Sequence, residues 1–185
     1  QMPKPEEPQQ DAWVATLARA VGTPGPEVTL IGHSAGVPTI LRYLESLPPG
    51  VTVGHVISVA GFASNPGYPE LDDFFTTPLD FSTITSHCSK FTVFTSENDP
   101  FVPVALAKEL ADAVGTTPYF VLGATHFSNR MTQVPILLDA SFGRPLPPSP
   151  VPPEVGPDGP PLPPMPEPLS VAYEPPIPPP QAAPA

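Results

Sequence analysis

The pattern of apolar and polar residues changes along the chain between the spacing of a helix and the short apolar runs of buried strands. Residues 9–21 carry apolar side chains at every third or fourth position, which is the spacing of one helix face. Gly22 and the proline-containing residues 23–26 then prevent the helix from continuing. Residues 28–31 form a short, β-rich apolar run that suits a strand buried in a parallel sheet. Helical spacing returns over residues 37–44.

The same alternation continues to about residue 142. Further strands are predicted at residues 51–62, 91–95 and 119–122, and further helices at residues 104–114 and 136–140. Residues 63–89 show no regular period and are predicted to be irregular. Strands that alternate with helices indicate an α/β fold with a parallel sheet covered by helices on both faces.

Proline content divides the chain into two parts. Of its 34 prolines, 19 fall within residues 144–185. Proline lacks a backbone N–H and has a fixed φ, so such a segment forms neither a helix nor a central strand. We therefore expect one folded domain at residues 1–143 and a disordered, proline-rich tail at residues 144–185.

The net charge of −11 narrows the classes of partner. An acidic surface repels nucleic-acid phosphates and anionic lipids, so neither nucleic acid nor a membrane is expected as a partner. The sequence contains no apolar run of about 18 residues and no signal-peptide pattern at its start. Cys88 is the sole cysteine and the histidines are scattered, so neither a metal nor a cofactor is expected. These features predict a cytoplasmic protein.

The pentapeptide at residues 32–36, Gly-His-Ser-Ala-Gly, fits the G-x-S-x-G pattern at a strand-to-helix junction. A nucleophile elbow occupies this position, because its sharp turn lifts the serine hydroxyl clear of the sheet. Side chains at Gly32 or Gly36 are expected to collide with neighbouring backbone. The following helix N-terminus offers free N–H groups to an oxyanion near Ser34. The alternative is a plain glycine-rich turn with a capping serine.

A serine hydroxyl needs a neighbouring base, and that base needs a third group to orient it. Asp99 follows the predicted strand at residues 91–95, and His126 follows the one at residues 119–122. Because functional groups gather at the carboxyl ends of parallel strands, both are expected near Ser34. The chain order of serine, acid and histidine is that of α/β-hydrolases.

Simpler interpretations of these side chains remain open. Asp99 could be a capping residue before Pro100, and His126 a surface-loop histidine. Glu97 is close enough to Asp99 to replace it as the acid. His33, inside the elbow, is expected to pack or support rather than to act as the base.

Several segments together resemble the small α/β-hydrolases of the retinoblastoma-binding protein 9 and YdeN-like serine hydrolase family. The resemblance begins at Met2, continues to about residue 142, and is carried by residues 32–45, 59–62, 98–103 and 123–127. It implies a Ser34–His126–Asp99 triad that cleaves small carboxylic esters or amides through an acyl-enzyme. It also implies that the backbone N–H of Ala35 is one oxyanion donor.

The beginning of the sequence departs from that family. Family members open with a strand ending in a His-Gly pair, which lies beside the strand leading to Ser34 and whose loop offers the second oxyanion donor. Without it, residues 28–31 are expected to form an exposed, apolar sheet edge. Losing one oxyanion donor typically lowers turnover by about 10²–10³, so impaired activity is expected.

Two remaining features concern substrates and partners. The aromatic segment at residues 62–81 is predicted to cap the site, with acyl-pocket walls formed by Phe62, Phe74, Phe75 and Phe101. These rings could instead pack the core. Residues 144–150 fit an arginine-led SH3-domain ligand and residues 160–163 a WW-domain ligand. The second hypothesis is therefore a catalytically weak, hydrolase-like interaction protein that binds such domains through its tail.

Overall fold

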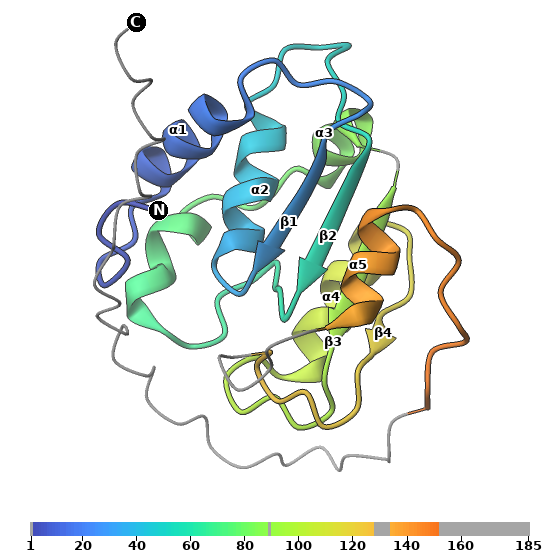
Figure 1. The fold of residues 1–185 in the computed structure, drawn as a ribbon. Helices are drawn as coiled ribbons and strands as arrows, with labels where there is room; N and C mark the ends of the chain where they lie inside the picture. The colour runs from blue at the N-terminus through green and yellow to red at the C-terminus, as the bar shows by residue number, and fades with distance from the viewer. Residues whose placement is uncertain (1, 89, 128–133, 152–185) are drawn as a thin grey trace, which may run out of the picture.

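The computed structural model describes residues 2–88, 90–127 and 134–151. Figure 1 shows a twisted sheet with helices on both sides. In this part of the chain the sheet has four strands, all parallel, in the order β1-β2-β3-β4. The strands are β1 (Thr29–His33), β2 (His55–Val59), β3 (Phe91–Thr95) and β4 (Tyr119–Phe120). The predicted α/β fold with a parallel sheet of about four strands is confirmed.

The predicted helices lie within one residue of their expected bounds. They are α1 (Gln10–Val21), α2 (Gly36–Glu45), α4 (Val104–Ala113) and α5 (Pro135–Ser141). Strand β4 is shorter than the four residues expected. Among the described residues, no helix is long and apolar enough to cross a membrane.

The prediction of an irregular segment at residues 63–89 is wrong in part. The structure forms a 3-10 helix, η1 (Pro69–Phe75), and a short α-helix, α3 (Phe81–His87). Helix α3 is rich in serine and threonine, which favour helices only weakly and hide the helical period. It is stabilised by the Asp80 carboxylate, which accepts the Thr83 N–H at 3.1 Å, and by the fully buried Ile84.

The central strand β2 is buried along its whole length, as expected for a parallel sheet covered on both faces. Its successive side chains enter different cores. Val56 packs with residues of α2 and α4, whereas Ile57 packs with Phe94 and with Ala140 of α5. Helices α2 and α5 therefore cover opposite faces of the sheet (Figure 1).

Strand β1 is the outermost strand of the described sheet. The Ser34 N–H donates to the Val59 carbonyl, so by the alternation of a parallel ladder Thr29, Ile31 and His33 turn their backbone groups away from β2. The Ile31 side chain is 55% exposed. Among the described residues, β1 is therefore an open edge of the sheet.

The first residues beyond position 143 contact the domain. Leu146 packs with the core beneath α5, Ser149 Oγ accepts the Phe120 N–H at 3.0 Å, and Arg144 pairs with Asp139 at 3.0 Å. A partner that reads residues 144–150 would have to displace these contacts. The WW-like residues 160–163 and the rest of the predicted tail beyond 151 lie outside the described residues.

His55 of β2 predicts a pH-dependent stability. Its buried imidazole lies 2.9 Å from Thr92 Oγ1 of β3, and desolvation lowers the pKa of His55 from 6.5 to about 4. As the pH decreases, the unfolded chain therefore takes up the proton before the folded protein does. The contribution of neutral His55 to the free energy of unfolding is fully present above pH 6.5 and is lost as the pH decreases toward 4. Between pH 7 and pH 5 we expect a loss of about 1–2 kcal/mol.

Urea unfolding at the two pH values measures this loss. The His55→Gln variant cannot take up the proton, so its stability should change less over the same interval. If the pH dependence of the variant equals that of the wild type, His55 is not its source.

Candidate active site

Ser34 occupies a sharp turn between β1 and α2. Its φ of +52° lies in the left-handed region, which is strained for a residue with a side chain. The turn is fixed on both sides, because the Ser34 N–H donates to the Val59 carbonyl at 3.0 Å and the Ser34 carbonyl accepts the Val37 N–H at 2.9 Å. The backbone therefore has the strained strand-to-helix geometry that the motif predicts.

The two glycines of the motif serve different purposes. A Cβ at Gly32 would lie 2.9 Å from Ile40 Cδ1 and 3.0 Å from the Gly36 carbonyl, so the collision expected there is confirmed. A Cβ at Gly36 would meet no atom within 4 Å outside its own helix. The collision predicted at Gly36 is wrong, because this position opens α2 and faces open space.

Asp99 and His126 are in contact, although they lie 27 positions apart in the chain. Asp99 lies beyond β3 and His126 beyond β4, and the His126 Nδ1 is 3.0 and 2.9 Å from the two carboxylate oxygens. The side chains are 1% and 12% exposed, respectively. Because a carboxylate only accepts, His126 Nδ1 carries a hydrogen; in the neutral tautomer with this hydrogen, the lone pair is on Nε2.

The Asp99 carboxylate is also held from behind. Its Oδ1 accepts the N–H groups of Phe101 at 2.9 Å and Val102 at 3.0 Å, in the turn that leads into α4. These bonds fix which oxygen faces the backbone and which faces only the imidazole. Asp99 thus caps the turn before α4, as the simpler interpretation proposed. The same side-chain conformation also lets it accept from His126.

His33 connects the histidine loop to the elbow. Its Nε2 lies 2.8 Å from the His126 carbonyl oxygen and the two rings are 4.8 Å apart. A carbonyl only accepts, so His33 donates; desolvation lowers the pKa of His33 and favours its neutral form. Ser34 Oγ makes no hydrogen bond to any described residue, so the structure joins His126 to Asp99 and to His33 but not directly to Ser34. Catalytic hydrogen bonds are often long without substrate.

Ala35 presents an unused donor at the start of α2. Its N–H makes no hydrogen bond within the described part of the chain, whereas the Val37 N–H is already used by the Ser34 carbonyl. The N-terminal end of a helix also carries positive potential. An oxyanion formed at Ser34 would find the Ala35 N–H free.

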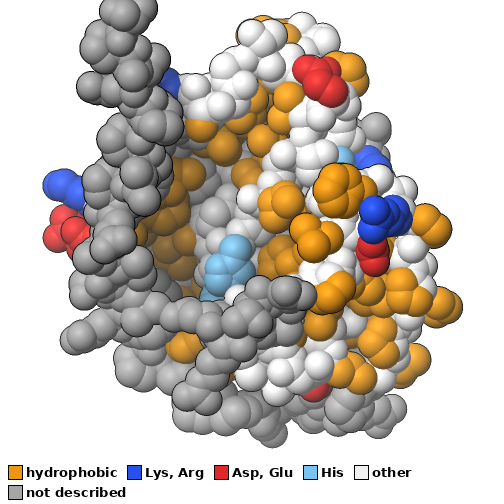
Figure 2. All heavy atoms as spheres, viewed as in Figure 1, with side chains coloured by type: hydrophobic (Ala, Val, Ile, Leu, Met, Phe, Trp, Pro, Cys, Tyr) orange, Lys and Arg blue, Asp and Glu red, His pale blue; other side chains and the backbone are white. Residues whose placement is uncertain are grey.

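Two aromatic rings border the elbow. Phe75 and Phe101 are partly buried and, with Ala35, pack against a cluster that contains Phe62. The Phe101 ring meets the His126 ring edge-on at 5.1 Å. Figure 2 shows hydrophobic side chains and a histidine beside a hollow on this face.

The other two predicted wall residues are part of the core. Phe74 has no exposed surface and packs edge-on against Trp13 of α1 at 5.9 Å. Phe62 is 1% exposed and supports Phe75 from behind, with 6.0 Å between their ring centroids. Phe62 and Phe74 therefore pack the core, and the prediction of pocket walls is left to Phe75 and Phe101.

Besides Asp99, two other residues of the loop after β3 hold the loop that carries His126. The Glu97 carboxylate accepts the Gly123 N–H at 3.0 and 3.1 Å, so this alternative acid supports the loop, while His126 Nδ1 pairs with Asp99. Asn98 accepts the Thr125 N–H at 2.9 Å. Sequence reasoning missed Asn98, although its place directly before Asp99 was a signal.

Comparison with known proteins shows the family of the chain. Residues 1–133 match the family described as serine hydrolase. The chain belongs to this family. It is 33% identical over 141 residues to the putative hydrolase YdeN of Bacillus subtilis (strain 168), covering 75% of this chain and 74% of YdeN. It is 26% identical over 130 residues to the serine hydrolase RBBP9 of Rattus norvegicus, covering 69% and 67%.

The likeness extends to three dimensions. The crystal structure of the ydeN gene product from B. subtilis superposes with a TM-score of 0.70 at 33% identity, covering 77% of this chain and 80% of that one. The resemblance inferred from the sequence is therefore confirmed, as is the α/β fold of this serine hydrolase.

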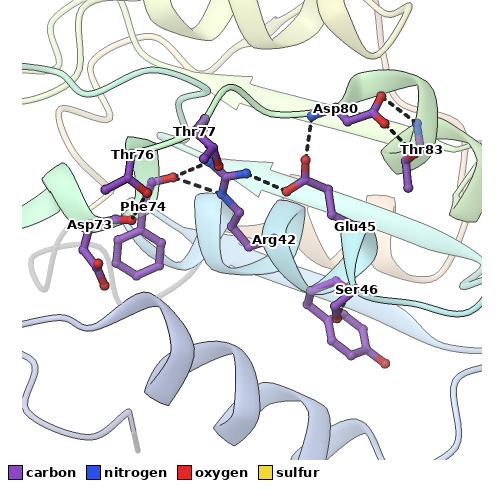
Figure 3. Close-up of polar contacts among 10 residues, drawn as sticks. Arg42, Glu45, Ser46, Asp73, Phe74, Thr76, Thr77, Asp80 and Thr83 are labelled. Carbon is purple, nitrogen blue, oxygen red and sulfur yellow. Dashed lines mark hydrogen bonds and ion pairs between the residues drawn. The ribbon is translucent and has the colours of Figure 1, made fainter.

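A second polar cluster of the serine hydrolase fixes the aromatic segment to the elbow helix (Figure 3). Arg42 of α2 donates to the Phe74 carbonyl at 3.0 and 2.8 Å and to the Thr77 carbonyl, and pairs with Glu45 at 2.7 Å. Glu45 in turn accepts the Asp80 N–H at 2.5 Å. The segment that carries Phe75 is thus tied to the helix that begins beside Ser34.

Proposed function

We propose that this serine hydrolase cleaves small carboxylic esters or amides through an acyl-enzyme on Ser34. The observation that carries the proposal is the contact between His126 Nδ1 and the buried Asp99 carboxylate, beside a strained turn that presents Ser34. Family membership supports hydrolysis in general, and the geometry supports these residues as its agents.

In the proposed reaction, Ser34 Oγ attacks the substrate carbonyl carbon while His126 Nε2 takes the hydroxyl proton. The carbonyl electron pair moves onto oxygen, and the oxyanion faces the free N–H of Ala35. Its collapse breaks the bond to the leaving alkoxide or amine, which receives the proton from His126. Water then repeats the sequence on the acyl-enzyme and releases the carboxylic acid. Asp99 holds the required tautomer and stabilises the imidazolium.

The surroundings of the site favour uncharged, apolar acyl groups. Phe75 and Phe101 offer ring surface beside Ala35, and an overall charge of −11 repels anionic substrates. We therefore expect short-chain neutral esters to be better substrates than dicarboxylate half-esters.

Labelling with a fluorophosphonate probe tests the proposal. The wild-type protein should be labelled at Ser34, and Ser34→Ala should lose both the label and the hydrolysis of p-nitrophenyl butyrate. The matched control is Ser82→Ala on the exposed surface of α3, which should be labelled as the wild type is. A folded wild-type sample that is not labelled, or labelling that survives in Ser34→Ala, would contradict the proposal.

A further inference from the structure

The proposed base is presented by a strained loop. Thr125 and Phe127, on either side of His126, have φ values of +50°. This left-handed region is uncommon for residues with side chains, and least favourable for β-branched ones such as threonine. Strained residues persist where their surroundings hold them in place. The contacts that hold this loop therefore bear on the position of the imidazole.

Asn98 forms a hydrogen bond from outside the loop to Thr125, one of the two strained residues. Its Oδ1 accepts the Thr125 N–H at 2.9 Å and the Ser96 hydroxyl at 2.8 Å. Two donors converge on this atom, which identifies it as the amide oxygen. Ser96 is fully buried at the end of β3, so it anchors Asn98 to the sheet.

Glu97 and His33 also hold the loop backbone, but at other residues. Glu97 holds Gly123, which adopts a positive φ without strain, and His33 holds the carbonyl of His126 itself. Of these three contacts, only the one from Asn98 holds Thr125, which directly precedes His126. Asn98 itself directly precedes Asp99. One short segment thus supplies both the acceptor for His126 Nδ1 and the support for its backbone.

We propose that Asn98 is a positioning residue that holds Thr125 in its left-handed conformation and thereby aligns His126 with Asp99 and Ser34. The inference rests on the proposed function of these three residues. The hydrogen bonds of Asn98 go to Ser96 and Thr125 and not to Ser34 or the His126 ring, so it acts through the loop. Its loss should move the imidazole and change turnover more than substrate binding.

Kinetics of a double-mutant set test this role. Asn98→Ala should lower kcat for p-nitrophenyl butyrate by about 10–100-fold with KM changed less than about 3-fold, because small displacements of a catalytic group are costly. Thr125→Gly alone should stay within about 3-fold of the wild type. Combined with Asn98→Ala, it should restore kcat at least about 5-fold, because glycine adopts the left-handed conformation without the Asn98 bond.

A nuclear magnetic resonance measurement separates this inference from the proposed function. With ¹⁵N-labelled histidine, the Nδ1–H signal of His126 bonded to Asp99 should weaken in Asn98→Ala and return in the double variant, whether or not the protein turns over esters. An inactive wild type with this pattern would overturn the proposed function and keep the loop role. An Asn98→Ala variant with unchanged kcat and an unchanged signal, or no restoration by Thr125→Gly, would overturn the inference.

Discussion

Replacing Asp99 with asparagine is expected to lower kcat by about 10⁴-fold with little change in KM. The reason lies in the two backbone donors behind the carboxylate. The N–H groups of Phe101 and Val102 require an oxygen at the Oδ1 position, so the amide nitrogen of the introduced side chain would take the Oδ2 position, 2.9 Å from His126 Nδ1. That nitrogen donates, so Nδ1 must accept and the hydrogen moves to Nε2. The imidazole would then be in place but unable to take the proton of Ser34.

The matched control is Glu97→Gln in the same loop. The glutamine side chain keeps an acceptor for the Gly123 N–H, so kcat should stay within about 10-fold of the wild type. Steady-state kinetics on p-nitrophenyl butyrate compare the two variants, and circular dichroism checks that both are folded. A larger loss in Glu97→Gln than in Asp99→Asn would assign the acid to Glu97 and contradict the site proposed here.

The strands that could be predicted are those whose apolar residues stand together in the sequence. The runs at residues 28–31 and 91–95 are short and rich in β-forming residues, and each became a strand close to its predicted bounds. Helix α3 could not be found this way, because four of its seven residues are serine or threonine and it depends on Asp80 and Ile84 for stability. One capping residue and one buried side chain do not produce the repeated apolar spacing by which a helix is predicted from sequence.

The candidate site also has residues that could be predicted from the sequence and residues that could not. Asp99 and His126 were predictable because each follows a parallel strand, and neighbouring strand ends bring them together. The supports Asn98 and His33 act through backbone groups of another loop, and only the folded loops show which groups these are. Likewise, Phe74 and Phe75 are adjacent, and it takes the η1 helix to turn one ring into the core and the other toward the elbow.

Replacing Arg42 with alanine should destabilise the protein by about 3 kcal/mol. The Arg42 side chain is only 7% exposed and satisfies the carbonyls of Phe74 and Thr77 as well as Glu45. Alanine would remove the donors to the buried Phe74 carbonyl, to the Thr77 carbonyl and to one Glu45 oxygen. A buried acceptor left without a donor carries a desolvation penalty. Urea unfolding at pH 7 measures the change as a lower midpoint with a similar slope.

The control is Arg144→Ala, which removes a pair whose side chains are 64% and 40% exposed. Exposed pairs contribute little, so the loss should be at most about 0.5 kcal/mol. Arg42→Lys keeps the charge but not the forked donors, and should fall between the two. Because Arg42 ties the segment with Phe75 to the elbow helix, its loss should also raise KM for apolar esters below the unfolding temperature. Equal destabilisation by Arg42→Ala and Arg144→Ala would show that the buried cluster does not hold this segment.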